Sequence, residues 1–95
     1  MASESGIEGR CKKIAEREGW LLLKLWPLGA AGIPDRILLR PGARVDFIEF
    51  KQPGKQLTII QQFWAARLGA LGFKCHRLDS VAGFRNIFQI GVANT

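Results

Sequence analysis

Three side chains in the middle of the sequence, Asp35, Glu49 and Lys51, have the types and the spacing to hydrolyse a phosphodiester bond. Side chains alternate between the two faces of a strand, so Glu49 and Lys51 emerge on the same face, about 7 Å apart. Asp35 begins the preceding apolar run, and a hairpin between the two runs would bring it to the same place. The pattern therefore predicts a site with two carboxylates and one ammonium group.

Each of the three groups has its own task in such a site. A hard divalent cation, Mg2+ or Mn2+, prefers oxygen ligands, and Asp35 and Glu49 supply two negative ones. The cation would lower the pKa of a water molecule and screen the charge of the phosphate. Lys51 could orient that water and stabilise charge on the phosphate oxygens, or act as a base if its own pKa were strongly depressed. On spacing alone, an exposed hairpin with ordinary salt bridges is the more common explanation.

The run over 44–51 predicts which side chains share a face with this site. Alternation puts two sets of residues on opposite sides of the strand: Val45, Phe47, Glu49 and Lys51 on one, and Asp46, Ile48 and Phe50 on the other. The turn Pro41-Gly42 joins this strand to the one before it.

The rest of the sequence predicts the elements that hold the site in place. Apolar residues recur at helical spacing in some segments and alternate in others, and Gly and Pro mark the breaks. The predicted order is a helix over 4–18, strands over 20–26, 35–39 and 44–51, a helix over 58–71, a strand over 73–78 and a helix from 79 or 80 to 88, with 27–32 a loop and 89–95 unassigned. This order, α-β-β-β-α-β-α, is typical of an α/β sandwich with a mixed sheet flanked by helices.

Composition limits the function classes. With 95 residues, 47% of them hydrophobic, the chain has room for one domain with a real core. Its 14 Lys and Arg against 8 Asp and Glu favour a polyanionic partner, nucleic acid above all, with membrane headgroups as the rival. No apolar stretch approaches transmembrane length and no signal peptide is evident, so we expect a cytoplasmic protein. Cys11 and Cys75 are expected to be free thiols, and the single His76 an ordinary strand residue.

The motifs around the three chemical residues, taken as an ordered set, resemble the VRR-NUC family (virus-type replication-repair nucleases). This family is a branch of the restriction-endonuclease-like PD-(D/E)XK superfamily. The likeness covers nearly the whole chain, over Glu4-Ser5-x-Ile7-Glu8, Gly32 to Asp35, Glu49 to Lys51, Pro53-Gly54-Lys55-Gln56-Leu57, Leu71-Gly72-Phe73 and Asp79-Ser80-Val81. It implies a single restriction-endonuclease-like domain over residues 1–95. The chain departs from the family at Phe50, where an aliphatic residue is usual, and at Ile59-Ile60, where many relatives are more polar or carry proline.

By position, the resemblance implies that Asp35 and Glu49 bind the metal ion, together with the backbone carbonyl of Phe50. Lys51 completes the E-x-K element.

Two further residues follow from the resemblance. The family's helical glutamine falls on Gln61, or on Gln62 if the register slips. The glutamate of its first helix falls on Glu4, which could assist the metal ion, with Glu8 as second choice.

Several cations and one helix point to partners. Lys24, Arg36 and Lys55 fall near the predicted site and could hold phosphates, although a solvated surface charge is the more common explanation for each of them. The predicted helix over 58–71 is apolar on more than the one stripe that covers a sheet. It is therefore either buried on several sides or part of an intermolecular patch. A twofold homodimer is favoured, because the stand-alone members of the family resemble junction-resolving enzymes, which need two paired active sites.

Three functions are consistent with these observations. The first is a metal-dependent, structure-selective endonuclease that cleaves branched DNA such as four-way junctions. The second is a non-catalytic DNA-binding module that keeps the nuclease fold. The third is a basic protein that binds RNA or a membrane surface. The complete set of Asp35, Glu49 and Lys51 favours the first.

Overall fold

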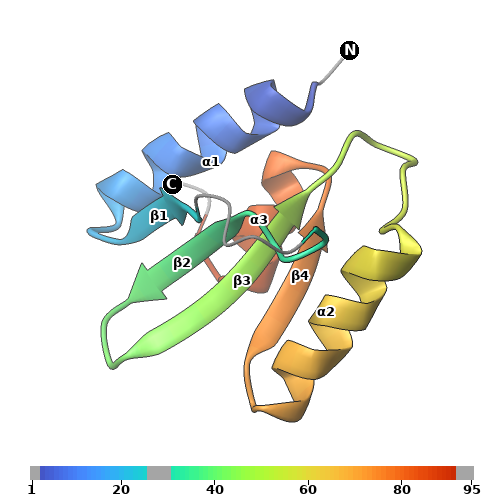
Figure 1. Cartoon of the computed structure of the whole chain (residues 1–95). Coiled ribbons are helices and arrows are strands. Elements are labelled where there is room, and N and C mark those ends of the chain that lie inside the picture. The colour runs from blue at the N-terminus through green and yellow to red at the C-terminus, as the bar shows by residue number, and fades with distance from the viewer. Residues whose placement is uncertain (1–2, 26–30, 92–95) are drawn as a thin grey trace.

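The computed structural model describes residues 3–25 and 31–91. Within them the elements follow the predicted order (Figure 1): α1 (Glu4–Arg17), β1 (Leu21–Lys24), β2 (Arg36–Arg40), β3 (Arg44–Phe50), α2 (Ile59–Ala70), β4 (Lys74–Leu78) and α3 (Val81–Ile87). The predicted α/β class is therefore confirmed. Boundaries differ by a residue or two at most ends, and the predicted strand over 20–26 is shorter. Trp26, most of the predicted loop over 27–32, and residues 92–95 lie outside the described residues.

The four strands form one mixed sheet in the order β1-β2-β3-β4. Strands β1, β2 and β3 are antiparallel neighbours, and a short turn over 41–43 joins β2 to β3. Strands β3 and β4 are parallel, and α2 forms the crossover that this pairing requires. The hairpin between β2 and β3 turns at Gly42 and Ala43, both of which have positive φ.

The core lies on one face of the sheet, under α1 and α3. Both helices begin at capping serines, Ser3 and Ser80, whose hydroxyls accept a hydrogen bond from the third residue of the helix. The core side chains come from both helices and all four strands: Ile7, Cys11, Ile14, Ala15, Leu22, Leu38, Ile48, Phe50, Leu78, Phe84, Phe88 and Ile90. As the alternation over 44–51 predicts, Ile48 and Phe50 point into this core while Glu49 does not.

The other face of the sheet is covered only in part. Helix α2 runs alongside β4 on that side (Figure 1), and none of its residues is buried. The alternative that α2 is buried on several sides is therefore wrong: its apolar residues Trp64, Ala65 and Leu68 are half-buried, and Ile59, Ile60 and Phe63 are exposed. On the same side of the sheet, Leu21 and Leu23 of β1 are 53% and 43% exposed.

Among the described residues, none of the helices has the length and apolar character needed to cross a lipid bilayer.

Candidate active site

The two predicted carboxylates come together through the register of the β2–β3 hairpin. The last pair of the ladder is Arg36 with Ile48. One step further along the same antiparallel register, Asp35 stands opposite Glu49. The backbone of Asp35 gives Glu49 a hydrogen bond, so the two residues are in contact. The carbonyl of Asp35 accepts a 2.8 Å hydrogen bond from the amide of Leu25, which ties this position to β1 as well.

Gly32 fixes the segment that leads into Asp35 against α2. Its φ of +90° is a conformation that L side chains rarely adopt. A Cβ atom at this position would lie 2.8 Å from a side-chain carbon of Ile60 and 2.9 Å from its backbone. Because only glycine permits this close approach, the chain passes directly beneath the first turn of α2, and Pro34 is buried there. Helix α2 and the segment that carries Asp35 are thereby positioned relative to one another.

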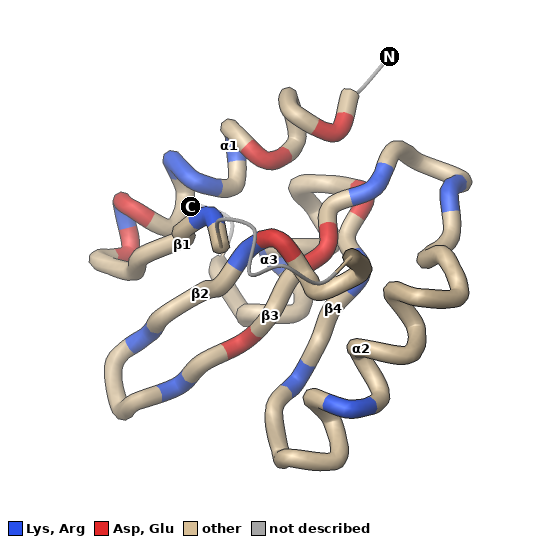
Figure 2. Tube along the Cα trace, in the orientation of Figure 1, with Lys and Arg blue, Asp and Glu red and all other residues tan. Residues whose placement is uncertain are grey.

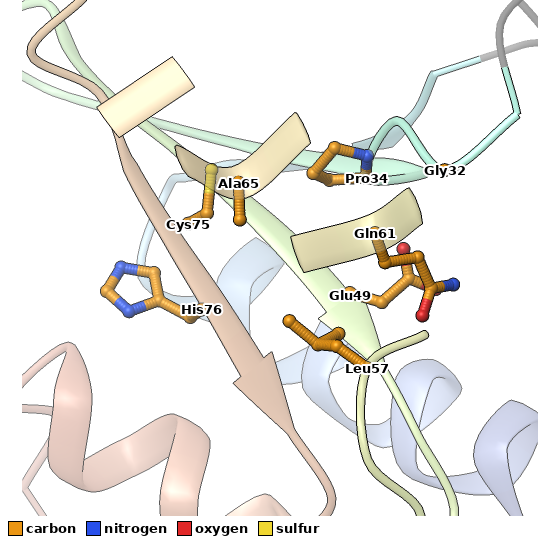
Figure 3. A pocket seen from close by; sticks show the side chains of 8 residues that line it. All are labelled: Gly32, Pro34, Glu49, Leu57, Gln61, Ala65, Cys75 and His76. Atoms are coloured by element: carbon orange, nitrogen blue, oxygen red, sulfur yellow. The ribbon is translucent and has the colours of Figure 1, made fainter. Parts of the chain in front are cut away.

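Glu49 lines a narrow pocket between the sheet and α2 (Figure 3). The pocket is about 20 Å³, room for one water molecule, and its walls include Pro34, Leu57 and Ala65. The pKa of Glu49 is raised to about 7, chiefly by burial; the negative charges of Asp35 and Glu4 contribute to this rise, and Lys51 opposes it. These effects show that Asp35, Lys51 and Glu4 all lie close enough to Glu49 to act on its charge.

Gln61 approaches Glu49 from the helix side of the same pocket (Figure 3). The side-chain Oε1 of Gln61 accepts a 2.9 Å hydrogen bond from the backbone amide of Thr58. The backbone amide of Gln61 in turn donates to the Thr58 hydroxyl, and this capping box starts α2. The side chain of Gln62 instead donates to the carbonyl of Leu57. Of the two glutamines considered from the sequence, the structure places Gln61 beside Glu49.

The side chains at this site fit a divalent cation. Asp35 Oδ1 is buried and has no hydrogen-bond partner, which leaves a carboxylate oxygen unsatisfied. Its neighbour Glu49 has a raised pKa partly because a second negative charge is close, and a cation would relieve that repulsion. In the described part of the chain, no three His, Cys, Asp or Glu side chains gather as a ready-made metal site. The remaining ligands would have to be backbone oxygens, such as the Phe50 carbonyl, and water.

Helix α1 forms the opposite wall of a wider cleft, of about 460 Å³, that reaches Asp35. Its lining residues are Ser3, Glu4, Ser5, Glu8, Lys24, Asp35, Arg36 and Gln52. Glu4 is exposed at the mouth of this cleft.

Arg36 holds Glu8 and Asp35 together inside this cleft. Its guanidinium is ion-paired with Glu8, donates a 3.0 Å hydrogen bond to the Asp35 carbonyl and lies 3.4 Å from Asp35 Oδ2. The Arg36 side chain is only 11% exposed. The structure thus places Arg36 as a link between α1 and Asp35, whereas the sequence suggested a phosphate contact. Glu8 and Arg36 are 28 positions apart, so no local pattern could have revealed their pairing.

The other cations considered from the sequence lie in different elements around the site. Lys24 lines the cleft beside Asp35. Lys55 is exposed in the connection between β3 and α2, where its carbonyl accepts hydrogen bonds from the Arg77 guanidinium. Lys51 follows β3 directly, and its amide donates to the carbonyl of Leu78 at 2.9 Å.

Comparisons with known proteins find similarity in sequence and in fold. Family models give no match to the chain. A phage protein named "Putative nuclease p44", from Acyrthosiphon pisum secondary endosymbiont phage 1, is 35% identical over 80 residues, which are 84% of this chain and 86% of that protein. A solved structure described as a VRR_NUC domain superposes with a TM-score of 0.83 at 21% identity, covering 94% of this chain and 97% of its own.

Proposed function

The chain belongs to the VRR-NUC family of nucleases, and we propose that it is a Mg2+- or Mn2+-dependent endonuclease that cleaves branched DNA, four-way junctions above all. The observation that carries this proposal is the contact between Asp35 and Glu49 at the end of a rigid hairpin, with one Asp35 oxygen buried and unsatisfied. A DNA substrate would place the enzyme in the cytoplasm of a bacterial or phage-infected cell.

In this proposal the chain's own groups have separate roles. Asp35, Glu49 and the Phe50 carbonyl would hold the cation, which supplies Lewis acidity toward water and phosphate when it is bound. Lys51 donates hydrogen bonds to the phosphate oxygens as negative charge builds on them. Gln61 orients a water molecule in the pocket that it shares with Glu49. Glu4 completes the acidic wall of the cleft.

A cleavage panel tests this proposal. Junction, flap, fork, splayed and linear duplex DNA are incubated with Mg2+, with Mn2+ and with EDTA. We expect cuts in four-way junctions with either metal, at least tenfold slower cutting of linear duplex, and none in EDTA. Equal rates on junction and linear DNA would contradict the preference for branched substrates. DNA binding without any cleavage would instead support the non-catalytic module.

The uncovered sheet face supports a twofold homodimer. Across β1, β2 and β3 this face, here called the open face, consists of Leu21, Leu23, Ile37, Leu39, Val45 and Phe47. Phe63 of α2 and Phe73 are also 51% and 39% exposed. An apolar surface of this extent on a small domain is typical of an interface. A second copy would cover it by a symmetric contact and would supply the second active site that a four-way junction needs.

Charge substitutions test this dimer. Leu23→Glu should raise the dimer dissociation constant at least tenfold, because it buries an unpaired carboxylate in an apolar contact. Ile87→Glu is a matched control, because Ile87 is also 43% exposed but lies on α3, on the other side of the sheet. Light scattering over a range of concentrations measures the mass. A monomeric wild-type protein, or equal effects of the two substitutions, would contradict the proposed interface.

A further inference from the structure

A group of basic side chains lies at the end of the sheet farthest from the carboxylates. Arg40 and Arg44 pair across the β2–β3 hairpin, and Lys74 at the start of β4 pairs with Asp46. Paired residues share a face of the sheet, as do residues two apart on one strand. These three cations, here called the distal basic patch, therefore emerge on one face of the sheet. In Figure 2, blue segments that mark Lys or Arg lie on β2, β3 and β4 at this end of the sheet.

The patch surrounds a shallow depression of about 210 Å³. Besides the three cations, its walls are Val45, Asp46 and Gly72. Gly72 has a φ of +96° and nothing within 4 Å of where a Cβ would stand, so an incoming group can approach the backbone here. The depression therefore combines positive charge with space for a phosphate group.

Two of the cations are held in place before any ligand arrives. The Arg40 guanidinium stacks over the rings of Trp20 and Phe88, at 5.4 and 4.9 Å, and donates a 3.0 Å hydrogen bond to Asp46. Arg44 Nε donates a 2.9 Å hydrogen bond to the carbonyl of Pro41. Since these side chains are already ordered, binding an anion would lose less conformational entropy.

The local charge balance also favours an anionic ligand. Asp46 is the acidic residue of the depression, and it is 5% exposed. Its two oxygens are engaged by Arg40 and by His76, at 3.0 and 2.8 Å. Arg44 and Lys74 are exposed. The depression thus presents at least two positive charges that Asp46 does not neutralise.

We propose that the distal basic patch is a second DNA contact, which binds the phosphate backbone of duplex DNA away from the scissile bond. This inference rests on the proposed DNA substrate. Arg44 precedes Glu49 by five residues on β3, which corresponds to about 17 Å along the strand. The patch is therefore separate from the carboxylate site and needs no metal ion. Backbone contacts of this kind carry affinity without sequence preference.

Charge reversal in EDTA tests the patch. The double variant Arg44→Glu/Lys74→Glu is compared with Lys12→Glu/Lys13→Glu, which makes the same change in net charge on the exposed side of α1. Fluorescence anisotropy measures binding to a linear duplex over a range of salt concentrations. We expect the patch variant to bind at least tenfold more weakly than the control, with a log–log salt slope reduced by about 2. Thermal melting checks that both variants fold.

Each result decides one proposal. Equal losses in the two double variants, or wild-type protein that binds no duplex, would overturn the patch. A patch variant that loses affinity for anionic vesicles or RNA but not for duplex DNA would also overturn it. Because binding is measured in EDTA, the outcome does not depend on cleavage. If the patch variant binds duplex DNA more weakly than the control, the second DNA contact is supported even when the cleavage panel shows no activity. The absence of cleavage would overturn the nuclease proposal alone.

Discussion

Asp35→Asn and Glu49→Gln are each expected to lower the rate of junction cleavage by about 10³-fold or more, with DNA binding retained. Both substitutions keep the size of the side chain and remove a negative oxygen ligand. The carboxylates are proposed to hold a cation whose stabilisation of the transition state is worth several kcal/mol, and each 1.36 kcal/mol corresponds to a factor of ten in rate. The measurement is the single-turnover cleavage rate of a four-way junction with saturating Mg2+.

Glu16→Gln is the matched control, because it makes the same chemical change at an exposed position of α1. It should cleave at the wild-type rate. Calorimetric titration with Mg2+ in the absence of DNA should show weakened binding for the Asp35 and Glu49 variants and unchanged binding for the control. Full activity in either active-site variant would show that this carboxylate does not serve catalysis.

Stability separates a catalytic loss from an unfolded protein. Burial raises the pKa of Glu49 to about 7, above its ordinary value of 4.5. The folded state therefore holds this proton more tightly than the unfolded state does, and stability without metal falls as the pH rises from about 4.5 through 7. Glutamine carries no such charge. Glu49→Gln should thus be at least as stable as wild type at pH 8 in EDTA, although it is inactive.

The carboxylate pair was accessible from the sequence because it depends on two local rules. Alternation over 44–51 puts Glu49 on the face opposite Ile48 and Phe50, and both of these are buried as expected. A hairpin closed by a short turn then has few possible registers, and the one that pairs Arg36 with Ile48 carries Asp35 to Glu49. Local periodicity and turn length therefore predicted this part of the site.

The contacts that the sequence did not reveal are between distant elements. Arg36 was considered as a phosphate contact, but tertiary packing pairs it with Glu8 of α1. The sequence also left undecided how far α2 is exposed, because an apolar helix has the same pattern whether a neighbouring domain or a second copy of the chain covers it. The sequence did indicate that Asp46 is unusual, because alternation puts this charged residue on the buried face of β3. Its partners Arg40 and His76 could be identified only from the fold.

The buried group around Asp46 leads to the largest effect on stability that we expect. Asp46→Asn should lower the free energy of unfolding by about 3 kcal/mol, because the Arg40 guanidinium would lose its charged partner in a largely buried place. The Arg40 side chain is 14% exposed and that of Asp46 is 7% exposed. An ionised carboxylate only accepts hydrogen bonds, so His76 Nε2 donates to Asp46 and would lose that charged acceptor too. Urea unfolding at pH 7 in EDTA measures the change.

A less deeply buried ion pair provides the comparison that isolates burial as the cause. Arg77 Nη1 and Asp79 Oδ2 are 2.7 Å apart, but the two side chains are 23% and 35% exposed. Asp79→Asn removes the same charge from a pair with similar geometry, and water compensates for much of the loss. We expect less than about 1 kcal/mol there. If both substitutions had the same effect, the charge of Asp46 would contribute no more to stability than that of the less buried Asp79 does.

The pH dependence of the free energy of unfolding provides an independent test of the role of Asp46. Burial alone would raise the pKa of Asp46, but the hydrogen bonds from His76 and Arg40 outweigh it and hold the pKa below its ordinary value. The unfolded state therefore takes up the proton first, and the stabilisation by Asp46 is complete above about pH 4 and lost as the pH falls below it. The difference between wild type and Asp46→Asn should accordingly shrink as the pH falls below about 4. A difference that grew as the pH fell below about 4 would mean that Asp46 is held as the neutral acid, so that Arg40 would have no charged partner to lose.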